Sequence, residues 1–103
     1  MFENYIDTNS KASWAPDYLL FIGNVYYVTF REEKALDIYE KFIRLYPNNE
    51  GTADVYFKRA ICLQELSQKD KAVEAYNDFA EKFPGHPDAA EARRRAGLIR
   101  YTH

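Results

Sequence analysis

An internal repeat of 37 residues constrains the fold of this chain more than any other feature. Residues 35–47 read ALDIYEKFIRLYP, and residues 72–84 read AVEAYNDFAEKFP. Alanine, tyrosine, phenylalanine, a second aromatic residue and a final proline (Pro47 and Pro84) stand at matching positions. Self-similarity at a fixed period is typical of proteins built by stacking copies of one small unit. We therefore expect a repeat architecture.

The spacing of apolar residues predicts that these units are helical. Hydrophobic side chains recur every three or four residues, as in Ala35, Tyr39 and Phe42, which places them on one helix face. No useful stretch alternates apolar and polar residues, and no Asn-Gly or Asp-Gly hairpin turn occurs. The predicted fold class is all-α with about five helices, at residues 15–29, 33–46, 52–66, 69–83 and 88–100.

Applying the period to the whole chain gives its expected organisation. One domain, 1–103, contains repeat one at 16–52 and repeat two at 53–89, with half-repeats or caps at 1–12 and 90–103. The N-terminal half-repeat is suggested by Phe2, Tyr5 and Ile6, which stand 37 residues before an equivalent aromatic or isoleucine. Terminal half-repeats of this kind would also allow a homo-oligomer to form through the chain ends.

Composition excludes several function classes. Hydrophobic residues make up 47% of 103 residues, which favours a packed domain over a disordered chain. A net charge of −2 offers no electrostatic basis for binding nucleic acid. No apolar run approaches the roughly 18 residues of a membrane span, so direct membrane insertion is not expected. The opening MFENYIDTNSKAS lacks the basic and apolar regions of a signal peptide.

The sequence contains no catalytic, cofactor-binding or metal-binding motif. The chain has no phosphate-binding loop, His-Glu-x-x-His, Cys-x-x-Cys or Gly-x-Ser-x-Gly. Cys62 occupies an apolar helix position, so we expect a structural thiol and not a nucleophile. His86 stands in a proline-flanked loop, where capping or contact with solvent is more plausible than metal ligation. The sequence therefore predicts that the chain is not an enzyme.

The repeat resembles the tetratricopeptide repeat, in which small residues, aromatic residues and a closing proline recur at fixed positions. The matching residues here are Gly23, Tyr26, Ala35, Tyr39 and Pro47, followed by Tyr56, Ala60, Leu63, Ala72, Tyr76 and Pro84. The resemblance implies a right-handed solenoid of antiparallel helix pairs, although the period exceeds the usual length of about 34 residues. The long repeats are also similar to those of bacterial envelope proteins, of the β-barrel assembly lipoprotein and Tol–Pal coordinator types. That likeness implies the periplasm or the outer-membrane periphery, for which this chain carries no targeting signal.

In this repeat class the first helix of each pair lines a concave groove. The resemblance therefore implies a binding surface at Leu20, Asn24, Tyr27, Phe57, Ile61 and Gln64. Four of these six residues are apolar or aromatic, and an exposed patch of that kind marks an interaction site. The alternative is that neighbouring repeats of a longer array fill the groove.

We accordingly expect a scaffold that binds an apolar peptide or helix segment of a protein, in a bacterial envelope assembly. The alternative function is an accessory or oligomerisation domain of a larger enzyme. A second candidate surface is the run Arg93, Arg94 and Arg95, which could meet an acidic partner. The competing interpretation is a solvated helix face, on which arginine stems cover apolar surface while their charged ends stay in water.

Overall fold

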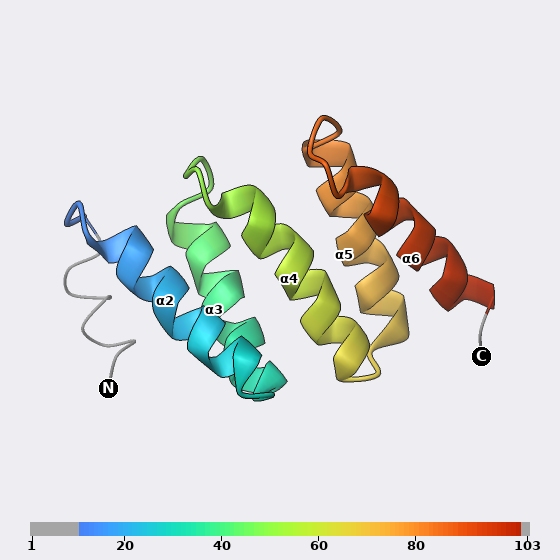
Figure 1. Cartoon of the computed structure of the whole chain (residues 1–103), viewed down its shortest axis with the longest axis horizontal. Coiled ribbons are helices and arrows are strands. Elements are labelled where there is room, and N and C mark those ends of the chain that lie inside the picture. The colour runs from blue at the N-terminus through green and yellow to red at the C-terminus, as the bar shows by residue number, and fades with distance from the viewer. Residues whose placement is uncertain (1–10, 102–103) are drawn as a thin grey trace.

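The computed structural model describes residues 11–101, and this part of the chain forms five α-helices without any strand (Figure 1). The helices are α2 (Ala15–Val28), α3 (Glu32–Leu45), α4 (Thr52–Glu65), α5 (Lys69–Lys82) and α6 (Ala89–Tyr101). The predicted all-α repeat fold is confirmed, and every predicted helix end lies within two residues of the observed one. Most of the expected N-terminal half-repeat, residues 1–10, lies outside the described residues.

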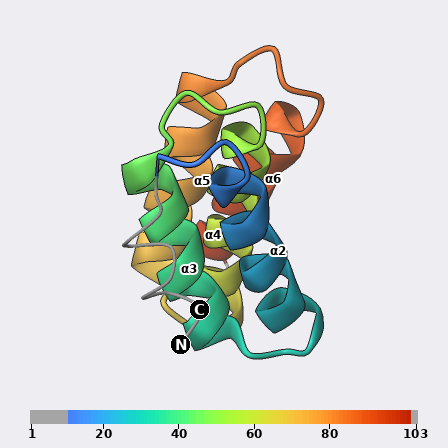
Figure 2. The same cartoon turned by 90° about the vertical axis from the view of Figure 1, so that its left-hand side faces the viewer.

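The helices are arranged in two layers. Figures 1 and 2 show α2, α4 and α6 along one face of the molecule and α3 and α5 along the other. Each helix packs chiefly against the helices that precede and follow it in sequence. The molecule is therefore a row of helix pairs, and α2, α4 and α6 share the face on which the groove was predicted.

Each helix pair is closed by a turn with a left-handed residue. Phe30 and Ser67, which stand 37 residues apart, both have a φ of 62°. The following N–H then reaches back over the helix end, and Arg31 N donates to the Tyr26 carbonyl at 2.9 Å. The second pair repeats this bond at the same length. A left-handed residue at this position satisfies carbonyls that a helix end would otherwise leave free.

The prolines define the opposite ends of the pairs. Tyr46 and Phe83, each directly before a proline, adopt φ near −130° (−131° and −129°) and leave the helical conformation. The ring of a proline disfavours the α conformation of the residue before it, so α3 and α5 end here. Both aromatic rings are half-buried, whereas those of Tyr39 and Phe42 are fully buried.

The core lies between the two layers and is built from the repeated residues. Tyr39, Phe42, Tyr76 and Phe79 are all 0% exposed. Small residues let the helices of a pair approach closely, and a Cβ placed on Gly23 would lie only 2.8 Å from Cε1 of Tyr39. Close approach at small residues and filling by aromatic rings thus explain the pattern that the sequence repeats.

Candidate functional site

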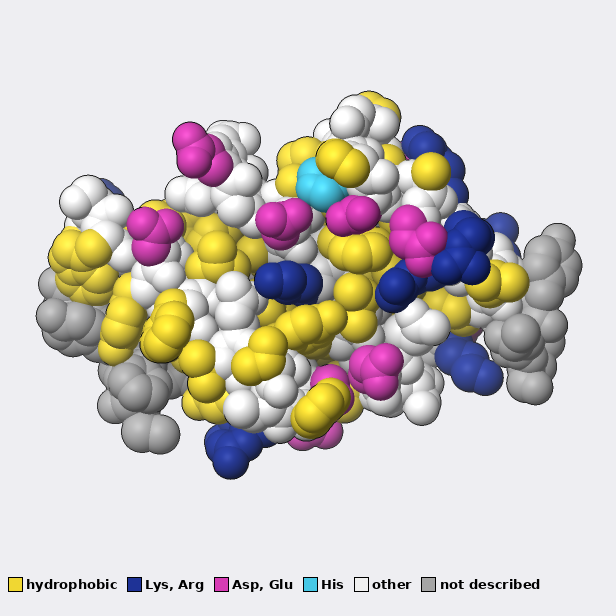
Figure 3. All heavy atoms as spheres, viewed as in Figure 1, with side chains coloured by type: hydrophobic (Ala, Val, Ile, Leu, Met, Phe, Trp, Pro, Cys, Tyr) yellow, Lys and Arg dark blue, Asp and Glu magenta, His cyan; other side chains and the backbone are white. Residues whose placement is uncertain are grey.

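The six predicted groove residues lie on two helices of one face. Leu20, Asn24 and Tyr27 come from α2, and Phe57, Ile61 and Gln64 come from α4. Gln64 is exposed, and the other five are half-buried. Figure 3 views this face and shows broad hydrophobic areas interrupted by separate charged side chains. The surface is therefore mainly apolar and remains accessible.

Polar contacts connect α2 to both α3 and α4. The hydroxyl of Tyr39 donates to Oδ1 of Asn24 at 2.6 Å. The ammonium of Lys58, on α4, donates to the same oxygen at 3.1 Å. Lys58 also lies 5.7 Å from the centre of the Tyr27 ring. Two of the predicted groove residues, Asn24 and Tyr27, are thereby held beside one cation from the next repeat.

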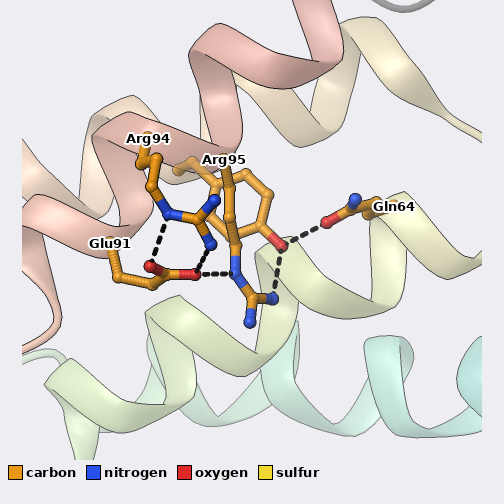
Figure 4. A network of polar contacts seen from close by, with 5 residues as sticks. Gln64, Glu91, Arg94 and Arg95 are labelled. Atoms are coloured by element: carbon orange, nitrogen blue, oxygen red, sulfur yellow. Dashed lines mark hydrogen bonds and ion pairs between the residues drawn. The ribbon is translucent and has the colours of Figure 1, made fainter.

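The second repeat forms a related arrangement with α6. The hydroxyl of Tyr76 donates to Oε1 of Gln64 at 2.6 Å and accepts a longer bond from Nη1 of Arg95 at 3.4 Å (Figure 4). The Arg95 guanidinium lies 5.5 Å from the centre of the Phe57 ring. Lys58 and Arg95 stand 37 residues apart. Each repeat therefore sends a cation from the same position to an aromatic ring of the preceding repeat.

Lys58 and Arg95 were not among the groove residues predicted from the sequence. The 37-residue period could have identified them, because positions 58 and 95 are equivalent and both carry a basic residue. A cation over an aromatic ring contributes about 0.5–1 kcal/mol at an exposed site and more where water is excluded. The contacts between successive repeats are thus partly electrostatic on the face that was predicted to bind a partner.

The remaining predicted residues have different surroundings. The Phe57 ring packs against the rings of Tyr76 and Phe79, with centroids 5.9 and 5.2 Å apart, so this residue also supports the core. Leu20 lies at the loop end of the face, where its Cδ2 would be 3.2 Å from a Cβ at Gly51. Ile61 packs against the core and keeps part of its surface accessible.

Burial keeps the buried tyrosines and the cysteine in their neutral forms. Removal from water raises the pKa of both Tyr39 and Tyr76, which preserves their hydroxyl protons as donors. The thiol of Cys62 is 0% exposed, and burial raises its pKa to about 12. A buried thiol that stays protonated is a poor nucleophile, in agreement with the structural role expected for Cys62.

The arginine run does not form one continuous basic patch. Arg94 and Arg95 both contact the carboxylate of Glu91, at 2.6 and 2.8 Å (Figure 4). Their hydrogen bonds lower the pKa of Glu91 to about 2. Arg93 turns toward α5, where its Nη2 donates to the Ala80 carbonyl at 3.5 Å. Two of the three cations are therefore already paired with one carboxylate, and the attraction of an acidic partner to these three residues stays a prediction.

His86 has the capping role that its loop position suggested. Its Nδ1 accepts the N–H of Asp88 at 3.0 Å, and its Nε2 lies 3.2 Å from Oδ1 of Asp54. Asn49, which stands 37 residues earlier, likewise accepts the N–H of Gly51 at 2.9 Å. Within residues 11–101 no cluster of histidine, cysteine and acidic side chains could hold a metal ion.

No helix in the described part of the chain is long and apolar enough to cross a membrane. Comparison with known families matches a tetratricopeptide-repeat model twice, at residues 17–49 and 54–86. No curated protein matches the chain. Tetratricopeptide repeats generally mediate protein–protein interactions and are typically non-catalytic scaffolds. The two consecutive matches cover more than half of the sequence, and the chain belongs to the tetratricopeptide-repeat family.

Proposed function

We propose that this chain is a non-catalytic scaffold that binds an apolar protein segment along the face of α2, α4 and α6. The observation that carries this proposal is the accessible surface from Leu20 to Gln64, in which four apolar or aromatic side chains and two carboxamides lie on two helices. Mainly apolar surfaces with a few fixed polar groups are suited to peptide recognition. The likeness of the repeats to bacterial envelope proteins supports a place in an envelope assembly.

The proposal can be tested without knowing the natural partner. A phage-displayed library of random 12-residue peptides is selected on the immobilised protein, and affinities of synthetic copies are measured by fluorescence polarisation. Ile61→Ala and Tyr27→Ala should each weaken binding about tenfold, because both remove apolar surface from the groove. Val73→Ala and Tyr56→Ala are the matched controls: Val73 is half-buried on α5, and Tyr56 lies under another lysine away from the groove.

Two outcomes would overturn the proposal. One is the failure of the library to give any peptide that binds in the micromolar range. The other is binding that ignores Tyr27→Ala and Ile61→Ala yet collapses when salt is raised, which would place the partner on the arginines at 93–95.

A further inference from the structure

One side of α2 carries a stripe of large apolar side chains. Its members recur at alternating steps of four and three residues and are Trp14, Tyr18, Phe21, Val25 and Val28. We call these five residues the outer stripe. Phe21 and Val28 are 65% and 66% exposed, and Val25 is 41% exposed. Figure 3 shows hydrophobic side chains gathered over α2, which stands at one end of the row of helices in Figure 1. Alternating steps of four and three are the spacing at which one helix packs along another.

The equivalent positions of the next repeat are buried by helix packing. Val55 and Cys62 stand 37 residues after Tyr18 and Val25, and both are 0% exposed in α4. α4 packs against both α3 and α5, whereas α2 has its main contacts with α3 alone among the described helices. The outer stripe is thus a helix-packing surface, and no second helix from residues 11–101 lies along it.

A pocket beside Phe21 has the form that a packing side chain requires. It has a volume of about 260 Å³ and is lined by Tyr18, Phe21, Ile22, Val25 and Tyr26. Four residues at positions i, i+3, i+4 and i+7 of a helix form the hole into which a facing helix inserts one side chain. The first four lining residues stand at these positions. The pocket therefore suits an apolar side chain from another helix.

The outer stripe matches the size pattern of a second, antiparallel copy of itself. Phe21 is its middle member, so a twofold axis beside Phe21 places Trp14 opposite Val28 of the second copy, and Tyr18 opposite Val25. Each of these layers pairs a large ring with a small side chain. The two Phe21 rings pack beside the axis, each into the pocket of the other copy. Large and small side chains on facing positions fill a helix interface without voids.

Charge favours this pairing over a head-to-tail stack. The outer stripe has no charged member, and Asp17 is the only charged residue of α2. In the antiparallel pair the two Asp17 side chains lie about 12 Å apart along the helix, beyond the Debye length of about 8 Å at physiological salt. A head-to-tail stack would instead place the exposed Arg93 and Arg100 of α6 against apolar rings. Burial of these cations without a carboxylate is unfavourable.

From this match of size and charge we propose that the outer stripe joins two copies of the chain in an antiparallel, twofold-symmetric dimer. The exposed parts of Phe21 and Trp14 amount to roughly 160–260 Å², at about 150–250 Å² for a whole aromatic side chain. The valines add to this area, but a dimer of the usual size buries about 800 Å² on each partner. The dimer is therefore weak and reversible.

The dimer is tested by sedimentation equilibrium of the whole chain between about 5 and 500 μM, a range that suits a weak interface. The mean mass should rise with concentration from 12.1 kDa toward twice that value. Phe21→Asp places two like charges beside the twofold axis, so the dissociation constant should rise about 100-fold or more. Phe30→Asp is the matched control, because Phe30 is 81% exposed in the turn and outside the stripe. It should leave the masses unchanged.

A charge exchange separates an interface effect from a folding effect. Phe21→Lys should also be monomeric, and an equimolar mixture of Phe21→Lys with Phe21→Asp should regain the dimer, because opposite charges then meet at the axis. The circular dichroism of each variant should match that of the parent, since the Phe21 side chain is exposed. A mixture that stays monomeric would overturn the twofold arrangement at Phe21.

Oxidative crosslinking tests the antiparallel register. Packed helix axes lie about 8–10 Å apart and each Cα lies about 2.3 Å from its axis, so facing Cα atoms at position 21 come within roughly 6 Å. Phe21→Cys should therefore form a disulfide-linked dimer. Val28→Cys is equally exposed but should not, because the two copies of residue 28 lie about 21 Å apart along the helix. The native thiol, Cys62, is buried.

Three results would overturn the proposal. A mass of 12.1 kDa at every concentration would leave the outer stripe to be covered from within the same chain, for example by residues 1–10. A mass that keeps rising beyond the dimer would indicate a head-to-tail stack. Crosslinking as efficient at residue 28 as at residue 21, or a dimer that ignores Phe21→Asp, would show that the two copies meet elsewhere.

Discussion

Gly23 packs directly against the ring of Tyr39, with no room for a side chain between α2 and α3. A Cβ at Gly23 would lie 2.8 Å from Cε1 of Tyr39 and 3.0 Å from Cγ2 of Ile38. The ring cannot move aside easily, because it is fully buried and its hydroxyl is bonded to Asn24. We expect Gly23→Leu to destabilise the protein by about 1–3 kcal/mol or more, measured by thermal melting.

Gly97 provides the control for this prediction. It stands two periods after Gly23, yet a Cβ there would meet no atom within 4 Å. Gly97→Ala should therefore stabilise α6 by up to about 1 kcal/mol through helix propensity alone. That gain corresponds to a rise in Tm of roughly 4–8 °C for a domain of this size. If Gly23→Leu left the Tm unchanged, the proposed packing of the first helix pair would be wrong.

The left-handed turn residues predict a stabilising substitution. Phe30 and Ser67 both have positive φ, a conformation that costs a residue with a Cβ roughly 1 kcal/mol relative to glycine. Ser67→Gly should therefore raise the free energy of unfolding by about 0.5–1 kcal/mol in urea titrations. Ser67→Ala keeps the Cβ and should give no such gain. Equal effects of the two substitutions would mean that the turn conformation is not the cause.

The buried tyrosine hydroxyls should contribute measurably to stability. Tyr39→Phe removes the donor to Asn24, and we expect a loss of about 0.5–1.5 kcal/mol in urea unfolding. A double-mutant cycle with Asn24→Ala tests the assignment, because the two losses should not add if they report one hydrogen bond. Strict additivity would show that the hydroxyl acts through something other than Asn24.

Alkaline conditions should destabilise the fold. Burial raises the pKa of Cys62 from 9.0 to about 12 and raises that of Tyr39 above its ordinary 10.0. The folded state therefore favours the protonated groups, so their stabilisation is complete below pH 9 and is lost as the pH rises toward 12. The Tm should fall steadily over this range. Cys62→Val should reduce the early part of that fall, and an unchanged pH profile would exclude a contribution from the thiol.

The outer face of α2 exposes large apolar side chains, so the prediction of an N-terminal half-repeat can be tested by experiment. Phe21 is 65% exposed and Val25 is 41% exposed, beside an apolar pocket of about 260 Å³. The equivalent positions of α4 carry Lys58 and the buried Cys62. If residues 1–9 cover this face, in the same chain or in a second copy, deleting them should lower the Tm or change the oligomeric state in light scattering. A shortened protein with the parent's stability and mass would show that they do not.

The sequence predicted the helices well because each boundary has a local cause. Pro47 and Pro84 end two helices, and the 37-residue period transfers every assignment from one repeat to the other. The resemblance to the tetratricopeptide repeat also selected the face that contains Asn24 and Gln64. It could not show that their amides are bonded to the tyrosines of the second helices, because that depends on how far apart the packed backbones lie.

Charged side chains were harder to place. Arg95 could have joined its neighbours on a solvated face, but it turns toward Glu91 and the Phe57 ring. Long flexible side chains have several rotamers of similar energy, and the choice among them depends on contacts from other helices. Phe57 illustrates the same limit, since the pattern placed it in the groove and its packing against Phe79 also ties it to the core.

Because each helix packs chiefly on its neighbours in sequence, the molecule is extensible. A duplicate of residues 52–88 inserted after Asp88 would add one helix pair without breaking the packing on either side. The inserted copy of Lys58 would contact the Phe57 ring and the Tyr76 hydroxyl, which Arg95 contacts now. Arg95 would contact the inserted copies of that ring and that hydroxyl. Every new junction would thus carry its own cation and its own amide bonded to a buried tyrosine, so the face of α2, α4 and α6 would lengthen in steps of 37 residues.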